Sequence, residues 1–457
     1  TVTDTTASAS DLNTINTKTA SAVSLGNVTT VTGARTDLAT LYGANGSTVT
    51  GLGNEAITVT DANITSAQAN TIDAYTTGAV TATISTQTIA DLDDLTGTGN
   101  AYTITVGDAS VTAAALNTVN AATTVNVTAT AVTTITGTAS QLATTYGGGM
   151  TGLGNEAITV SDTSITSAQA NTIDAYTTGA VTATISTQTI ADLDDLTGTG
   201  NAYTITVGTA QVTAAALKAV DAATTVNVTA TAVTQITGSA ADLADVYGGG
   251  ITGLGDETIV LTDTTLAAAT LTPTVNGYST VAINANSVTT LTGTNAEIVA
   301  AYAADTAGTV IIDGDAKLTV SDNITSAEAN TLDAKTTGVI TATISTTAIG
   351  DLDDLTGTGN AYTITVNTAQ VTAAALRTVN EATTVAVTAT NVTQITGSAA
   401  DLAVVYDGGI SNLGDETIIL TDTTLAAATL TPTVNGYSSV AINANSVTTL
   451  TGTNAEI

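Results

Sequence analysis

Long stretches of this 457-residue sequence recur almost letter for letter. The segment ITSAQANTIDAYTTGAVTATISTQTIADLDDLTGTGNAYTITV starts at Ile64 and again at Ile165, and a close variant starts at Ile324. A second segment, DETIVLTDTTLAAATLTPTVNGYS, starts at Asp256 and recurs with small changes at Asp415. Such self-similarity is the sequence signature of repeat architectures, in which each unit buries its apolar side against its neighbours.

Each long copy contains two half-repeats. An aliphatic residue marks the equivalent position in each, such as Val59 in one half-repeat and Val106 in the next. We therefore predict one continuous solenoid over residues 1–457, in which loops of variable length absorb the differences between units. The predicted half-repeats lie near 2–58, 59–105, 106–159, 160–206, 207–260, 261–319, 320–365 and 366–419, with a partial copy at 420–457.

Each half-repeat holds two similar coils. A coil opens with alternating residues, as in Ile57–Val59, Val80–Ile84 or Tyr102–Val106, which predicts a half-buried strand. It continues with a Thr-capped, Ala-rich stretch such as Thr112–Val119, or with Ala90–Leu95, which predicts a short helix. The expected fold is a β-solenoid-like stack of about 17 coils, with parallel strands and short helices or turns in each coil.

The alternation also assigns faces. One set of aliphatic side chains should form ladders inside the stack: Val59, Ile64, Ile72, Val80, Ile84, Ile89, Leu92 and Leu95. A set of threonines should form ladders on the open face: Thr58, Thr81, Thr83, Thr103 and Thr105. Threonine suits that position because its branched Cβ favours a strand while its hydroxyl meets water.

Composition removes whole classes of function. The chain has no Cys and no His, and six Lys plus Arg stand against 39 Asp plus Glu, for a net charge of −33. Because histidine and cysteine carry most acid–base, nucleophilic and zinc chemistry, we predict that the chain is not an enzyme. Its negative charge argues against nucleic acid and anionic membranes as partners. The sequence contains no apolar run of about 18 residues, so no membrane span is predicted.

Acidic clusters are the candidate metal ligands. They recur in the three copies of the DLDDL motif: Asp91, Asp93, Asp94, Asp192, Asp194, Asp195, Asp351, Asp353 and Asp354. Oxygen ligands suit calcium, but acids in the first turn of a helix are also favoured by its dipole, and that structural reading is preferred. The segment GLGDETI at Gly253 resembles calcium-binding coils only loosely, since its Gly-to-Asp spacing differs. We expect no cofactor, with calcium as the one alternative.

Three further features have both a structural and a functional interpretation. Paired outward threonines resemble the flat hydroxyl arrays of ice-binding solenoids. The glycine-rich loops at 147–149, 248–250 and 408–409 lack the residues of a phosphate loop and are expected to be turns. Asn126, Asn227 and Asn391 match the N-glycosylation pattern.

The stretches NAYTITV, VTAAALNTVNAATT and ITSAQANTIDAYTTG resemble the Thr/Ala-rich tandem-repeat regions of very large cell-surface proteins of marine cyanobacteria. This resemblance covers nearly the whole chain and rests on repeat texture. It implies an exported, surface-attached or shed filamentous protein. The calcium-binding nonapeptides of many such proteins are missing here.

The predicted function is therefore a structural repeat segment of an extracellular fibre, surface layer or appendage, located outside the cell or on its surface. Because the sequence begins and ends in mid-pattern, we expect it to be an excerpt whose coils continue. The expected partners are further copies, associating head to tail or laterally, with cations or glycans as other candidates. The alternatives are the stalk of an adhesin or phage-type fibre, with recognition elsewhere, and an ice-binding solenoid.

Overall fold

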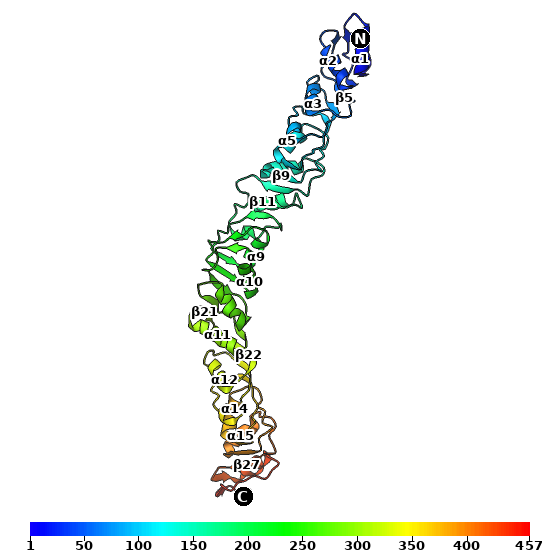
Figure 1. Ribbon diagram of the computed structural model, residues 1–457. Coiled ribbons are helices and arrows are strands. Elements are labelled where there is room, and N and C mark those ends of the chain that lie inside the picture. Colours follow the sequence, from blue (N-terminus) through cyan, green and yellow to red (C-terminus); the bar gives the residue numbers. More distant parts are fainter. The chain divides into compact units, whose positions relative to one another are not determined.

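The computed structural model describes residues 1–457, which divide into two compact units. Unit 1 comprises Thr1–Thr209, Ala219–Thr231 and Gly250–Thr252, and unit 2 comprises Ala210–Lys218, Ala232–Gly249 and Gly253–Ile457. Both consist of short strands that alternate along the chain with short helices (Figure 1). Continuity of one solenoid over the whole chain stays a prediction.

The helices are α1 Ala9–Lys18, α2 Arg35–Gly43, α3 Ser66–Asp73, α4 Ile89–Leu92, α5 Ala113–Ala121, α6 Ala139–Gly147, α7 Ser167–Asp174, α8 Ile190–Leu193, α9 Ala214–Ala222, α10 Ala240–Gly248, α11 Asn295–Thr306, α12 Ser326–Asp333, α13 Ile349–Leu352, α14 Ala373–Glu381 and α15 Ala399–Asp407. Irregular helical turns η1 Thr270–Thr274, η2 Val275–Gly277, η3 Thr429–Thr433 and η4 Val434–Gly436 take the place of a helix in two coils. One helical segment per coil confirms the predicted number of coils.

The strands up to β15 are β1 Thr6–Ser8, β2 Val23–Ser24, β3 Thr30–Gly33, β4 Val49–Thr50, β5 Ala56–Val59, β6 Val80–Thr83, β7 Ala101–Thr103, β8 Ser110–Thr112, β9 Thr134–Gly137, β10 Ala157–Val160, β11 Val181–Thr184, β12 Ala202–Thr204, β13 Gln211–Thr213, β14 Val228–Thr229 and β15 Gln235–Gly238. The others are β16 Ile251–Thr252, β17 Thr258–Leu261, β18 Thr265–Ala267, β19 Ile283–Ala285, β20 Thr290–Gly293, β21 Val310–Ile312, β22 Lys317–Ile324, β23 Ile340–Ile344, β24 Ala361–Thr363, β25 Gln370–Thr372, β26 Gln394–Gly397, β27 Thr417–Leu420, β28 Thr424–Ala426 and β29 Thr449–Thr451.

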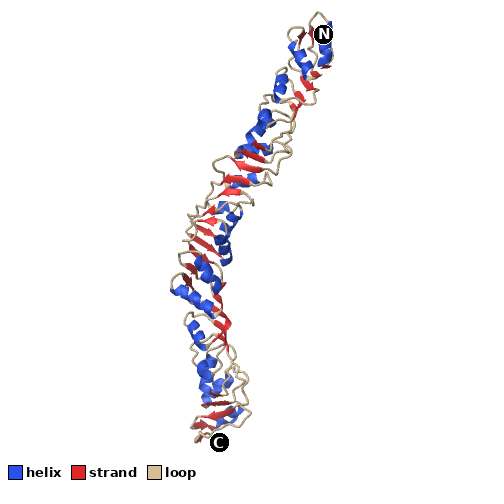
Figure 2. Ribbon diagram, viewed as in Figure 1, coloured by secondary structure: helices blue, strands red, loops and turns tan.

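Every strand pair is parallel, and each strand pairs with its equivalent in a neighbouring coil. Coil length varies, since Thr81 faces Ala101 in one pair whereas Ile283 faces Val310 in another. Helices also contact the helices of adjacent coils, as α5 does with α6 and α14 with α15 (Figure 2). The fold is thus a repeat solenoid, as the sequence predicts.

The pairing does not form one unbroken sheet. Unit 1 contains the sheets β1-β3-β5-β6-β7 and β8-β9-β10-β11-β12, and unit 2 contains β13-β15-β17-β19-β21 and β18-β20-β22-β23-β24 among others. In unit 1 the second sheet begins at β8, in the same coil that ends the first sheet with β7. The sheets are therefore staggered along each stack, which the repeat pattern does not reveal.

The core consists of inward aliphatic ladders. Val31 faces Ile57, Ile57 faces Val80, and all three side chains are fully buried. The other predicted core residues are buried as well, except Ile89, which is half-buried because it opens the one-turn helix α4. The predicted strand Tyr102–Val106 is also shorter than expected, since β7 ends at Thr103 and only isolated bridges continue to Val106.

Aspartates from one coil cap the helix of the preceding coil. The backbone N–H of Ala139, at the start of α6, donates to Asp162 Oδ2 at 2.7 Å, and that of Arg35 donates to Asp61 Oδ2 at 2.6 Å. Equivalent contacts join Ile89 to Asp108, Ala240 to Asp263, Asn295 to Asp322 and Ala399 to Asp422. A carboxylate satisfies an unpaired N–H and complements the positive end of the helix dipole, so these acids link coils.

Replacing an inward ladder residue should loosen the stack locally. Leu116 in α5 is fully buried, so Leu116→Ala should cost about 2–5 kcal/mol through lost burial and a residual cavity. Because each coil contacts only its neighbours, amide hydrogen exchange should accelerate in α5 and adjacent coils and stay unchanged far away. Exposed Thr118 provides the control, and equal exchange in Leu116→Ala and Thr118→Ala would contradict the assigned core.

Candidate functional site

A pocket of about 400 Å³ lies beside the C-terminal end of α7. Its walls are Asp174, the turn Thr177–Ala180 and the turn Thr197–Gly200. An equivalent pocket of about 340 Å³ is lined by Asp333, Thr336–Val339 and Thr356–Asn360. The same residues recur around Asp73, where the sequence also reads D-A-Y-T-T-G-A and T-G-T-G-N. The surface is mostly polar, with hydroxyl groups, backbone and one carboxylate.

The aspartate in the pocket wall is paired with an asparagine. Asn201 Nδ2 donates to Asp174 Oδ1 at 2.7 Å, while Asn201 Oδ1 accepts the backbone N–H of Val181 at 2.7 Å. Asn100 pairs in the same way with Asp73, and Asn360 with Asp333. The carboxylate lies so close to Gly198 that a Cβ there would stand 2.6 Å from Asp174 Oδ1. A side chain at position 198 would therefore displace Asp174 or Asn201 and disturb their hydrogen bond.

A buried tyrosine lies behind each pair. Tyr203 is 1% exposed, and its hydroxyl has no hydrogen-bond partner. Burial, followed by the negative charge of Asp174, raises the pKa of Tyr203 above its ordinary value. Tyr102 and Tyr362 are equivalent in burial, in their unpartnered hydroxyls and in the direction of their pKa shifts. Most buried polar groups in proteins have a partner, so three identical exceptions mark this as an unusual environment.

A second cluster contains a fully buried glutamate. Glu156 precedes β10 and accepts the N–H of Gly154 with both carboxylate oxygens, each at 2.9 Å, and the hydroxyl of Tyr146 at 2.8 Å. The Tyr146 ring stacks on Tyr176 with centroids 4.8 Å apart. Thr177 Oγ1 donates to the Glu156 carbonyl at 2.6 Å. We call this arrangement the Glu–Tyr brace, and it ties together residues of successive coils.

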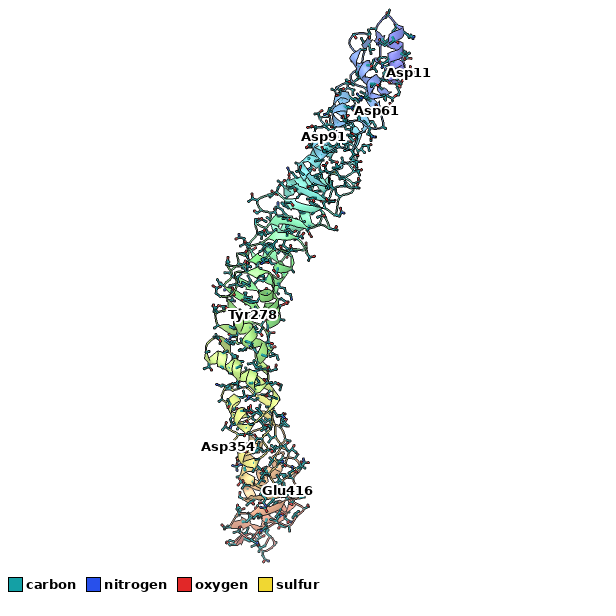
Figure 3. The ribbon with its side chains drawn as sticks, viewed as in Figure 1. Asp11, Asp61, Asp91, Tyr278, Asp354 and Glu416 are labelled. Carbon is teal, nitrogen blue, oxygen red and sulfur yellow. The ribbon has the colours of Figure 1, made fainter.

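The brace has four copies. The others are Tyr42, Glu55 and Tyr75; Tyr247, Glu257 and Tyr278; and Tyr406, Glu416 and Tyr437. Figure 3 labels Tyr278 and Glu416. Sequence reasoning missed these residues because it examined GLGDETI for calcium ligands at Asp256. A signal in the sequence could have identified them. The glutamate directly after position 256 or its equivalent recurs in all four copies, and in each a tyrosine stands 10 or 13 residues before it.

The DLDDL aspartates occupy helix-terminal positions. Asp91 lies in the first turn of α4, where Thr88 Oγ1 donates to its carboxylate at 2.6 Å, and Thr189 contacts Asp192 equivalently. Asp93, Asp194 and Asp353 follow the last helical residue. The carbonyls of Asp94, Asp195 and Asp354 accept asparagine side chains of the preceding coil.

These aspartates do not converge on one point. Ala348 replaces the capping threonine next to Asp351, which therefore lacks that contact. Asp353 lines a separate pocket of about 400 Å³ with Gln370 and Gln394. No group of three or more His, Cys, Asp or Glu side chains is placed to hold a metal ion. The structure thus gives the clusters a role at helix ends.

The outward threonines form short ladders. Thr112, Thr136, Thr159 and Thr182 face one another in consecutive strands, and the next position is Ala202. In two of the three glycine-rich loops the first glycine still belongs to the helix, since Gly147 and Gly248 end α6 and α10. Gly408 follows the end of α15. Asn126, Asn227 and Asn391 are exposed.

No family model matches this chain, and no curated protein matches it. Among solved structures, it is similar to the LRR ectodomain of the plant membrane receptor kinase GASSHO1/SCHENGEN3 from Arabidopsis thaliana, solved in complex with Casparian strip integrity factor 2. The match is 11% identical, covers 87% of this chain and 50% of that chain, and has a TM-score of 0.14. A similarity this slight supports no inference. None of the helices has the length and hydropathy needed to cross a membrane.

Removing one hydroxyl should weaken the brace. Tyr146→Phe deletes the hydrogen bond to the buried carboxylate of Glu156, and hydrogen bonds to charged groups contribute about 1.5–3 kcal/mol. Denaturant titration and hydrogen exchange over residues 139–185 should both show the loss. Tyr176→Phe is the matched control, because it keeps the stacked ring, and equal effects of the two variants would contradict the brace.

The buried tyrosines also predict alkaline sensitivity. Burial raises the pKa of Tyr146, Tyr203 and Tyr247 above the ordinary value of 10.0, so the folded state holds these protons more tightly than the unfolded state. Their contribution to stability is complete below pH 10 and is lost as the pH rises above it. The free energy of unfolding should fall between about pH 10 and 12. Tyrosinate absorbance should appear with unfolding, and ionisation of every tyrosine near pH 10 without unfolding would refute this.

Proposed function

We propose that this chain is a structural repeat segment of an extracellular fibre, surface layer or appendage. The observation that carries the proposal is the pairing of each coil with the next through parallel strands, aliphatic ladders, aspartate caps and Glu–Tyr braces. These contacts stabilise a repetitive stack without disulfides, since the chain has no cysteine. The function lies in the stack itself, and we propose no catalytic activity.

A location outside the cell or on its surface is part of the same proposal, and the net charge bears on how copies associate there. The net charge of −33 keeps copies apart at low ionic strength and favours solubility. Association head to tail or laterally then requires that counter-ions screen this repulsion. At physiological ionic strength the screening length is about 8 Å, so only charges near the contact would still oppose assembly.

The adhesin or phage-type stalk is the second candidate, because the same stack would serve as a spacer for a recognition domain elsewhere. An ice-binding role has less support, because the threonine ladders of unit 1 are short: one ends at Ala101 after Thr32, Thr58 and Thr81, and another ends at Ala202 after four threonines. A longer array would be needed to present a flat, repeated hydroxyl surface.

Assembly of the purified chain tests the leading proposal. Light scattering and negative-stain microscopy should show filaments or sheets much larger than one chain, and raising the salt from about 10 mM to 150 mM should promote them by shortening the screening length. A chain that stays monomeric at every salt and protein concentration would contradict self-assembly and favour the stalk. The Leu116→Ala variant, with a loosened coil, should assemble less than the Thr118→Ala control.

A further inference from the structure

We propose that the pockets at Asp174 and Asp333, together with the equivalent aspartate–asparagine arrangement at Asp73, are binding sites for neutral carbohydrate, and that each takes one sugar unit of a polysaccharide. The proposal goes beyond a structural role, because it assigns a ligand to the stack. It rests on three observations: the repeated polar pocket, the carboxylate in its wall, and the absence of basic side chains from its lining.

The carboxylate is incompletely used by the protein. Asp174 Oδ1 accepts the amide of Asn201, which leaves Oδ2 as an acceptor for a ligand hydroxyl. Asp174 is also the last residue of α7, where the helix dipole disfavours a negative charge. Asp73 and Asp333 also end their helices, so the unfavourable interaction of the carboxylate with the helix dipole is present in all three copies. A donor-rich ligand would offset it.

Lining chemistry selects the ligand class. Thr197 and Thr199 are exposed on one turn and Thr178 on the other, so hydroxyls that both donate and accept surround the carboxylate. No Lys or Arg lines either pocket, which disfavours phosphate, sulfate and acidic sugars. Neither lining contains an aromatic residue, and the largest aliphatic side chain is Val339. An apolar ligand would therefore gain little burial.

A divalent cation fits less well. Calcium takes six to eight oxygen ligands at about 2.3–2.6 Å, whereas each pocket contributes a single carboxylate, and that carboxylate already accepts an amide. Pockets of about 400 and 340 Å³ are wide for one ion but lie within the range of about 300–1,000 Å³ for small-molecule sites. Such a volume has room for a sugar ring, which presents several hydroxyls at once.

Repetition favours a polymer over a free sugar. Within unit 1, α3 and α7 end the third and seventh coils, so Asp73 and Asp174 are four coils apart. At about 4.8 Å per strand spacing, the two sites are roughly 20 Å apart. Weak sites on one stack then bind one long ligand with increased avidity, because the second contact is intramolecular.

Binding of the full chain to immobilised dextran, mannan and galactan tests the proposal, with the corresponding free monosaccharides and calcium chloride as separate titrants. We expect saturable binding to at least one polymer and weaker binding of its monosaccharide. The triple variant Asp73→Asn, Asp174→Asn, Asp333→Asn should lose affinity about tenfold or more, the effect of one charge-assisted hydrogen bond per site. The control Asp91→Asn, Asp192→Asn, Asp351→Asn removes equal charge outside the pockets and should bind like the original chain.

A second pair of variants covers the case in which the triple variant misfolds. Ala180→Trp fills one pocket from an exposed position and should lower the number of sugar sites by one. Ala180→Val introduces the residue found at the equivalent position 339 and should leave the number of sugar sites unchanged. The proposal is overturned if none of the three polymers binds, or if the pocket and control variants bind a polymer equally well. It is also overturned if calcium binds, the pocket variant loses that calcium binding, and no sugar binds.

Discussion

The structure depends on parallel backbone pairing between coils, because a coil of 20 to 27 residues has only one apolar side and nothing of its own to bury it against. Pairing places Val31, Ile57 and Val80 directly above one another, so each side chain is covered by its equivalents. The same register brings an aspartate of one coil to the helix start of the preceding coil. Stability is then a sum of local coils and interfaces between neighbours.

The acidic residues make sense within that register. Several cap helices across coils, and the buried glutamates are satisfied by glycine N–H groups and a tyrosine hydroxyl. Basic residues contribute little to cohesion. Lys218 lies 2.5 Å from Asp245, and Arg377 lies 2.6 Å from Asp401. Both cations are about half exposed, and such surface pairs are worth roughly 0–1 kcal/mol. Hydrogen bonds to carboxylates, rather than ion pairs, connect the coils.

Features confined to a single coil could be predicted from the sequence. Alternation predicted β5 and β6, and the threonine cap with an Ala-rich body predicted α5 with Leu116 and Val119 inward. Features that join coils could not. The staggered sheets depend on register between coils. The Glu–Tyr brace brings together a glutamate, a tyrosine 10 or 13 positions before it and a tyrosine 20 or 21 positions after it, and only the fold places them in contact. The pockets escaped for the same reason, since their two turns come from successive coils.

The brace and the aspartate–asparagine pair can occur without each other, as two copies show. In the copy that contains the Asp333 pocket, Ala316 stands where the brace has its glutamate and Lys335 replaces the stacked tyrosine, yet the pair of Asp333 with Asn360 persists at 3.0 Å. Conversely, the brace at Glu257 stands next to Asn276 in place of the aspartate. If the aspartate only supported the brace, the two would be lost together. Their separation shows that the aspartate does not serve the brace, although Thr177 lines the pocket and also belongs to the brace. Within the fold the aspartate holds the asparagine that accepts a backbone N–H, as Asn360 accepts that of Ile340.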